Sequence, residues 1–131
     1  MADNIRVGNV SSIKYKKGLI EVTYPDLDDS VTDALPVFSF TGEYKMPKIG
    51  DEVLVVHLSN GESAGIVLGK FWGGDHKPPA YGKNVFRKEL GDEDGEAYIQ
   101  YKDSKLTFKS PEGSTTLGSI LQRLRNLEAR L

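Results

Sequence analysis

The chain has 131 residues, of which 38% are apolar, and these values fit one domain with a small core and a wide polar surface. Its 17 basic and 19 acidic residues leave a net charge of −2, which excludes a bulk attraction for nucleic acid or an anionic membrane. The absence of cysteine excludes disulfides and thiolate metal sites, and the longest apolar run, Val53–Val56, is far shorter than the roughly 20 residues of a membrane span.

The polar start of the chain, residues 1–4, predicts that it is not exported by a signal peptide. Alternating β-branched and aromatic residues then predict two strands, over 5–15 and 19–24, joined by a tight turn. Residues 25–33 are acidic and show no period, so they are predicted to form a loop. Alternation returns over 35–40 as a third strand.

Two further runs, 52–58 and 63–71, flank Asn60-Gly61 and predict a hairpin, because both of these residue types tolerate positive φ. Both faces of 52–58 are apolar, which predicts a central strand or one whose outer face is covered. Five strands in about 70 residues with no helix between them predict an all-β domain, a small barrel or sandwich, and the OB-fold is the commonest barrel of this size. The barrel is predicted to cover residues 1–82 and to end in the irregular segment 72–81.

A charged segment, 87–96, precedes a second predicted hairpin over 97–109. Alternation gives each of its strands an apolar face, formed by Ile99, Tyr101, Leu106 and Phe108. A lone two-stranded hairpin is marginal in water, so this one is predicted to lie on the barrel or on copies of itself. Residues 83–113 are therefore interpreted as a linker and a short β-shaft in which strands of several copies intertwine.

After residue 113 the apolar period changes from two to three and a half, which predicts a C-terminal helix over 114–131, capped by Ser114, Thr115 or Thr116. The apolar residues occupy the a and d positions of a heptad repeat: Leu117, Ile120, Leu124, Leu127 and Leu131. This narrow stripe fits identical helices better than docking on a barrel. Leucine at a with isoleucine at one d position favours trimers or tetramers over dimers, so the helix is predicted to be a coiled coil between subunits.

Candidate catalytic and metal sites are weak throughout the sequence. Residues 26–30 begin like a calcium loop, but valine replaces both its glycine and its bidentate glutamate. Residues 91–96 are most simply a charged turn, and His57 and His76 have no cysteine partners. No nucleophile elbow, phosphate loop or dinucleotide fingerprint occurs. The sequence therefore predicts no enzyme activity, no metal site and no cofactor.

An OB-fold leaves a second class of function open, the binding of single-stranded nucleic acid, which needs aromatic platforms between basic side chains. Tyr15 with Lys14, Lys16 and Lys17 forms such a cluster. The cluster lies at a hairpin turn, however, where exposed lysines commonly solvate a sheet edge. The predicted groove strand, 53–58, lacks Lys and Arg. Nucleic acid is therefore the alternative, and the sequence does not favour it as a partner.

One ordered set of residues resembles a known family. The stretch Met46–Val55, followed by Gly65–Gly69, is similar to the N-terminal OB-fold of the phage baseplate assembly protein V family, which the type VI secretion VgrG spike shares. The likeness includes residues 18–25 and 69–72 and covers about residues 5–80. The positions that carry it are Pro47, Gly50, Asp51, Val53, Gly65, Val67 and Gly69.

The resemblance implies a nonenzymatic, homotrimeric central spike that contacts a baseplate hub and pierces the target envelope mechanically. Its location would be a virion or tail-like particle assembled in the bacterial cytoplasm, and residues 97–111 would form one short turn of the shaft. Many family members continue into a long β-helix, sometimes tipped by a His-x-His iron site. This sequence contains no His-x-His. Either a separate tip protein caps the spike or the trimeric helix is its distal end.

Overall fold

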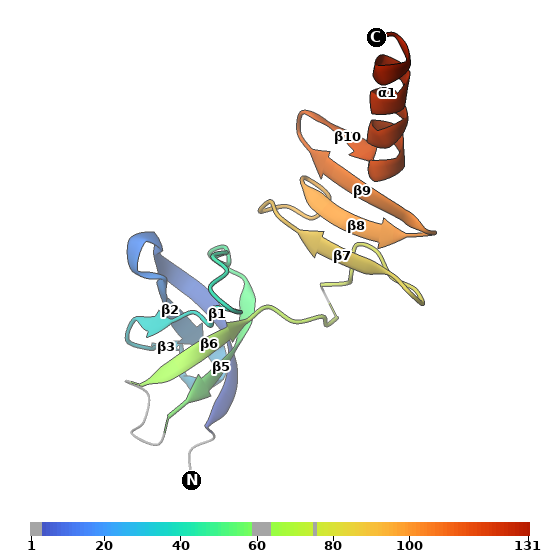
Figure 1. Cartoon of the computed structure of the whole chain (residues 1–131). Coiled ribbons are helices and arrows are strands. Elements are labelled where there is room, and N and C mark those ends of the chain that lie inside the picture. Colours follow the sequence, from blue (N-terminus) through green and yellow to red (C-terminus); the bar gives the residue numbers. More distant parts are fainter. Residues whose placement is uncertain (1–3, 59–63, 75) are drawn as a thin grey trace. The chain divides into compact units, whose positions relative to one another are not determined.

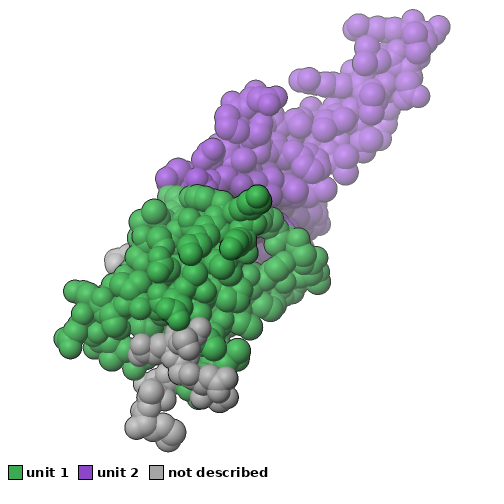
Figure 2. Space-filling view, turned by 90° about the vertical axis from the view of Figure 1, so that its left-hand side faces the viewer, with its two compact units in different colours: residues 1–76 green, residues 77–131 purple. Residues whose placement is uncertain are grey.

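The computed structural model describes residues 4–58, 64–74 and 76–131, and Figure 1 traces their elements. Two antiparallel sheets, of six and four strands, and one C-terminal helix make up this part of the chain. The predicted class, mainly β with a C-terminal helix, is confirmed. The chain divides into two compact units, residues 1–76 and 77–131, which Figure 2 colours green and purple.

The first unit contains one six-stranded sheet with the order β3-β2-β1-β5-β6, in which β4 also pairs with β2. Its strands are β1 (Ile5–Lys14), β2 (Leu19–Tyr24), β3 (Ser30–Val31), β4 (Leu35–Pro36), β5 (Glu52–His57) and β6 (Gly65–Gly69). Two single turns of 3-10 helix, η1 (Tyr15–Lys17) and η2 (Pro25–Leu27), follow β1 and β2. The strands predicted over 5–15, 19–24 and 52–58 are confirmed. The predicted Asn60-Gly61 turn lies outside the described residues.

Two predictions in the first unit are wrong. The segment 25–33, predicted as a loop, contains η2 and β3, because Val31 pairs with Thr23 of β2. The strand predicted over 35–40 stops at Pro36, whose ring nitrogen cannot donate to a ladder.

The six-stranded ladder stays open in the described residues, so the predicted closed barrel is not seen there. Segment 35–38 comes nearest to closing it. Leu35 pairs with Ile20 of β2, and Val37 then makes a single parallel bridge to Val67 of β6. Because β4 is only two residues long, this segment reaches both edges of the sheet without forming a full ladder to β6.

The core of the first unit consists of eight buried side chains: Val10, Ile20, Val22, Tyr24, Leu35, Val53, Val55 and Val67. In β5, buried and half-buried residues alternate, with Val53 and Val55 on the inner face and Leu54 and Val56 on the outer face. The strand lies between β1 and β6, which confirms its predicted central position.

Gly8 of β1 lies close against side chains and backbone of β2. A Cβ at this position would stand 2.5 Å from Cγ1 of Val22 and 2.7 Å from the carbonyl oxygen of Thr23. Because the backbone oxygen cannot move aside, Gly8→Ala should lower the free energy of unfolding by about 2 kcal/mol. Urea unfolding followed by circular dichroism measures this. Gly74→Ala, with nothing within 4 Å of its Cβ, is the matched control, and equal midpoints for the two variants would contradict the close approach.

A buried polar pair connects β2 and β5. The hydroxyl of Tyr24 lies 2.5 Å from Nε2 of His57, whose Nδ1 lies 3.3 Å from the carbonyl oxygen of Ala64. A neutral ring protonated at Nδ1 satisfies both contacts, donating to the carbonyl and accepting from the hydroxyl. Tyr24→Phe removes the donor to a buried nitrogen and should cost about 1 to 3 kcal/mol of stability. The same urea assay tests it, with Tyr81→Phe at an exposed site as control.

The second unit contains a four-stranded sheet with the order β10-β9-β8-β7, followed by the helix. The elements are β7 (Phe86–Glu89), β8 (Tyr98–Lys102), β9 (Lys105–Ser110), β10 (Gly113–Thr116) and α1 (Leu117–Ala129). The hairpin predicted over 97–109 is confirmed as β8 and β9, joined by a two-residue turn in which Asp103 and Ser104 both have positive φ. Strand β7 lies in the segment that was predicted only as charged.

The helix begins at Leu117, so residues 114–116, predicted to be part of it, instead form most of β10. These residues are Ser-Thr-Thr, and the turn at 111–112 returns them along β9, where Thr115 pairs with Phe108. The β-branched side chains favour the extended conformation. Of the three predicted caps, the structure uses Thr116, whose Oγ1 accepts a hydrogen bond from the N–H of Ser119 at 3.1 Å.

Candidate assembly surface

The second unit has no core of its own. All residues from 77 to 131 are described, and none of them is buried, whereas the first unit holds all eight buried hydrophobic side chains. Ordering a chain costs about 1 to 2 kcal/mol per residue in backbone entropy, which apolar burial must offset. The second unit therefore leaves its apolar side chains at least partly in contact with solvent.

The register of the strands gives this sheet one largely apolar face, which also carries Lys88 of β7 opposite Ile99. Ile99 lies opposite Phe108, and Tyr101 lies opposite Leu106, across β8 and β9. Directly opposite residues of an antiparallel pair project to the same side, so the four predicted interface residues share one face. Phe86 of β7, opposite Tyr101, adds a fifth side chain that is 59% exposed. We call this set the apolar face.

An open groove of about 500 Å³ lies at one end of the apolar face. Its lining includes Leu90, Ile99 and Phe108, together with Thr115 of β10. Leu90 is half exposed, and its N–H donates to the carbonyl oxygen of Ala97 at 2.8 Å, which extends the pairing of β7 with β8. The apolar face thus continues beyond the strands themselves and is only partly covered within its own unit: Ile99 and Leu106 are half-buried, whereas Phe86, Tyr101 and Phe108 are exposed.

The helix presents a second apolar surface. Its predicted a and d residues are exposed, with fractions from 37% at Ile120 to 56% at Leu127 and full exposure at Leu131; the set is Leu117, Ile120, Leu124, Leu127 and Leu131. No residue of α1 is buried, although the helix contacts β9 and β10. We call this set the leucine stripe. Four of these side chains lie on α1 and Leu131 follows its end, and together they leave much apolar area in contact with water.

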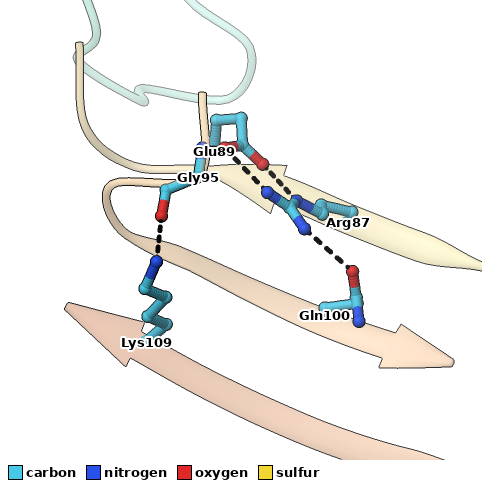
Figure 3. A network of polar contacts seen from close by, with 5 residues as sticks. All are labelled: Arg87, Glu89, Gly95, Gln100 and Lys109. Carbon is cyan, nitrogen blue, oxygen red and sulfur yellow. Dashed lines mark hydrogen bonds and ion pairs between the residues drawn. The ribbon is translucent and has the colours of Figure 1, made fainter. Parts of the chain in front are cut away.

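The opposite face of the four-stranded sheet is polar and internally bonded, as Figure 3 shows. Nε of Arg87 donates to Oε2 of Glu89 at 2.5 Å, and its Nη1 donates to Oε1 of Gln100 at 3.1 Å. The guanidinium also lies over the ring of Tyr98, 3.7 Å from the centroid. The hydrogen bond to Glu89 raises the pKa of Arg87 above its usual value, because it favours the charged guanidinium.

The same polar network holds the loop between β7 and β8. Oε1 of Glu89 accepts from the N–H of Gly95 at 2.6 Å, and Nζ of Lys109 donates to the carbonyl oxygen of Gly95 at 2.6 Å (Figure 3). Three strands and a loop are therefore connected by charge-assisted hydrogen bonds. A polar face with its charges paired in this way suits contact with solvent. The apolar face is poorly suited to contact with solvent.

The residues that carry the family resemblance have structural roles in the first unit. The N–H of Gly50 donates to the carbonyl oxygen of Val10, and Oδ2 of Asp51 accepts from the N–H of Lys48 at 2.8 Å, so the pair shapes the turn into β5. Val53 and Val67 are core residues, Gly65 is buried and Pro47 is half-buried. Gly69 has φ of 114° where the register of β5 with β6 shifts, a conformation that only glycine adopts easily.

The weak candidate sites have ordinary partners. Asp26, in the segment that begins like a calcium loop, pairs with Arg6 at 3.1 Å. His57 contacts Tyr24, and the ring of His76 lies 4.7 Å from that of Trp72. In the described ranges, no group of three or more His, Cys, Asp or Glu side chains is placed to hold a metal ion. No helix in the same ranges has the length and apolar character that crossing a membrane requires.

Sequence reasoning missed the contribution of β7 to this surface. Three of its four residues, Arg87, Lys88 and Glu89, lie in the segment predicted as charged, and they show no alternation of apolar and polar side chains that would indicate a strand. Comparisons of the chain with protein-family models and with curated proteins found no match. Any functional assignment therefore depends on the residues of this chain.

Proposed function

We propose that this chain is the structural subunit of a homotrimeric central spike in a phage tail baseplate or a phage-tail-like contractile injection particle. The observation that carries the proposal is the lack of any buried residue over 77–131, beside a continuous apolar face and a leucine stripe. Copies of one chain present the same surfaces at the same height along a common axis. Assembly of copies would therefore bury both surfaces at once.

For residues 1–82, which include the first unit, we propose an OB-fold barrel. Its antiparallel order β3-β2-β1-β5-β6, and the way segment 35–38 contacts both β2 and β6, support this assignment. The resemblance to the baseplate assembly protein V family supports it independently. The segment 83–113 would then act as a linker and β-shaft, and α1 as the helical end of the spike.

The proposed mechanism is mechanical and involves no catalysis. Contraction of a tail sheath would push a narrow trimer against the envelope of the target cell. Such a trimer must resist bending and splaying, and the bonds among Arg87, Glu89, Gln100 and Lys109 would stiffen its outer surface while the apolar faces meet inside. Its partners would be two further copies, a baseplate hub and, unless the helix itself forms the distal end, a separate tip protein.

Light scattering coupled to size-exclusion chromatography tests the proposal directly. The purified chain should elute as one species with three times the chain mass of 14.5 kDa. The mass should stay constant on dilution to low micromolar concentration, because the apolar surfaces of three chains are buried together. A monomer over the same range would overturn the proposal.

One observation favours a second candidate, the binding of single-stranded nucleic acid by the first unit. The hydroxyl of Tyr44 donates to the carbonyl oxygen of Tyr15 at 3.1 Å, which brings two exposed aromatic rings to the turn that carries Lys16 and Lys17. Aromatic platforms beside lysines are the usual single-strand surface. Fluorescence anisotropy with a labelled thymidine oligonucleotide at low salt distinguishes the candidates. The spike proposal expects no binding.

A further inference from the structure

We infer that β7 of one copy pairs with β10 of the next copy, so that three four-stranded sheets close into one β-prism. This inference rests on the proposed homotrimer and specifies how its subunits join. It begins from the two edges of the second sheet. Strands β7 and β10 are its outer strands, and no other described strand of the chain pairs with their outer edges. Open edges of this kind pair readily with another chain.

The number of strands decides which edges can meet. Adjacent strands of this sheet run in opposite directions, so with four strands β7 and β10 also run in opposite directions. When three copies stand side by side with one orientation, β7 of each lies beside an oppositely directed β10. Antiparallel pairing therefore continues across every subunit boundary, and a rotation of one third of a turn closes the ring.

The hydrogen-bonding positions on the two edges also match. The N–H of Leu90 donates to the carbonyl oxygen of Ala97. Because backbone groups of a strand alternate between its two neighbours, the N–H and C=O of Lys88 face β8, whereas those of Arg87 face the open edge of the sheet. In β10 the two-residue turn makes Ser110 and Gly113 a hydrogen-bonded pair, so the backbone groups of Gly113 and Thr115 face β9. The backbone groups of Ser114 therefore face the open edge of the sheet. Backbone groups that point outward on β7 and β10 can therefore meet in one ladder.

Side-chain chemistry selects the register of that ladder. If Lys88 lies opposite Thr115 of the next copy, Phe86 falls opposite Leu117 of that copy, and two exposed apolar side chains meet on the apolar face. A shift of two residues would place Phe86 opposite Thr115 and Lys88 opposite Gly113, which buries less apolar surface. The first register is therefore preferred.

Geometry favours three copies over two or four. Four strands spaced about 4.8 Å apart make a sheet about 19 Å wide. Three such sheets, arranged as the sides of a triangle, each lie about 5.5 Å from the axis, close to half of the roughly 10 Å that separates packed sheets. The apolar side chains would then fill most of the interior, which Lys88 would also face because it lies opposite Ile99. Four sheets would each lie about 9.5 Å from the axis and leave a hole along it. Two sheets could not enclose the apolar side chains on all sides.

A pair of engineered cysteines in the full chain tests the register. In the inferred ladder, residues 88 and 115 of neighbouring copies form a non-hydrogen-bonded pair, whose Cα separation of about 4.5 Å suits a disulfide. Lys88→Cys with Thr115→Cys should give, after air oxidation with oxidised glutathione, a covalent trimer on nonreducing gels that a thiol reductant converts to single chains. Each single-cysteine variant should give no trimer, and Phe86→Cys with Thr115→Cys, which fits the shifted register, should crosslink at least tenfold less.

The outcomes separate this inference from the proposed function. Light scattering of the reduced double variant reports whether it is trimeric, and the gel reports whether β7 meets β10. A reduced trimer that forms no covalent trimer would overturn the edge pairing and leave the spike intact. If the reduced double variant and the wild-type chain are both monomeric, the edge pairing and the proposed spike are both overturned. A series of gel bands for covalent species of more than three chains would show that the edges pair without closing into a ring of three, which overturns the prism.

Discussion

Leu124→Asp should convert the trimer into monomers at micromolar concentration. Leu124 lies at the middle of the leucine stripe and is half exposed in the single chain. In a threefold helical seam, three carboxylates would meet one another with no partner cation on the stripe. Loss of three leucine side chains and burial of like charges together should weaken assembly by about 5 kcal/mol or more. Light scattering across a dilution series measures the change in mass.

A matched control separates the seam from the helix itself. Asn126→Asp adds the same charge to α1 away from the stripe, at a residue whose Oδ1 accepts from Nε2 of Gln122 at 3.0 Å and would still do so as a carboxylate. This variant should remain trimeric. Both variants should retain the urea unfolding transition of the first unit, whose core holds no residue of α1. A Leu124→Asp protein as trimeric as the parent would rule out the helix as a subunit contact.

Strong local periodicity made much of the fold predictable. Strand β2 alternates inward apolar residues with outward ones and is followed by Pro25, whereas β5 contains the continuous apolar run Val53–Val56 typical of a central strand. The helix shows an equally clear period of three and a half residues. In such segments the burial pattern is repeated several times within one element, so no knowledge of its neighbours is needed.

Elements that depend on distant partners were not predictable in the same way. Strand β7 has only four residues, and its pairing is stabilised by contacts of Arg87 with Gln100 and with the ring of Tyr98, thirteen and eleven residues ahead in the sequence. Strand β3 likewise depends on Thr23 of β2. Their local sequences are charged or short, so tertiary contacts decide the conformation.

The candidate surface was predictable only in its side chains. Alternation in the sequence identifies the apolar faces of β8 and β9, and the heptad identifies the leucine stripe. It does not reveal that residues 77–131 contain no buried position, because burial depends on how whole elements pack. Nor does it identify β7 and β10 as the two edges, which follows only from the strand order.

The sheet should hold the trimer together even when the helix is removed. Deleting residues 117–131 leaves β10 in place and keeps the apolar face, with Ile99, Tyr101 and Phe108 available to meet their copies. The truncated chain should therefore remain trimeric at tens of micromolar and dissociate on dilution, since it lacks the leucine stripe. A short helix of this kind is marginal alone, which is why the adjoining sheet is needed to set the three helix starts in register.

A second change in the truncated chain tests the sheet contact itself. Phe108→Ser removes an aromatic side chain from the apolar face and should cost about 2 to 3 kcal/mol per chain of buried apolar area, enough to produce monomers at every concentration tested. Thr107→Ser, on the polar face of the same strand, is the control and should leave the truncated trimer unchanged. Sedimentation velocity distinguishes these states. If the truncated chain is already wholly monomeric at tens of micromolar, the helix alone assembles the protein, and the apolar face must be buried in some other way.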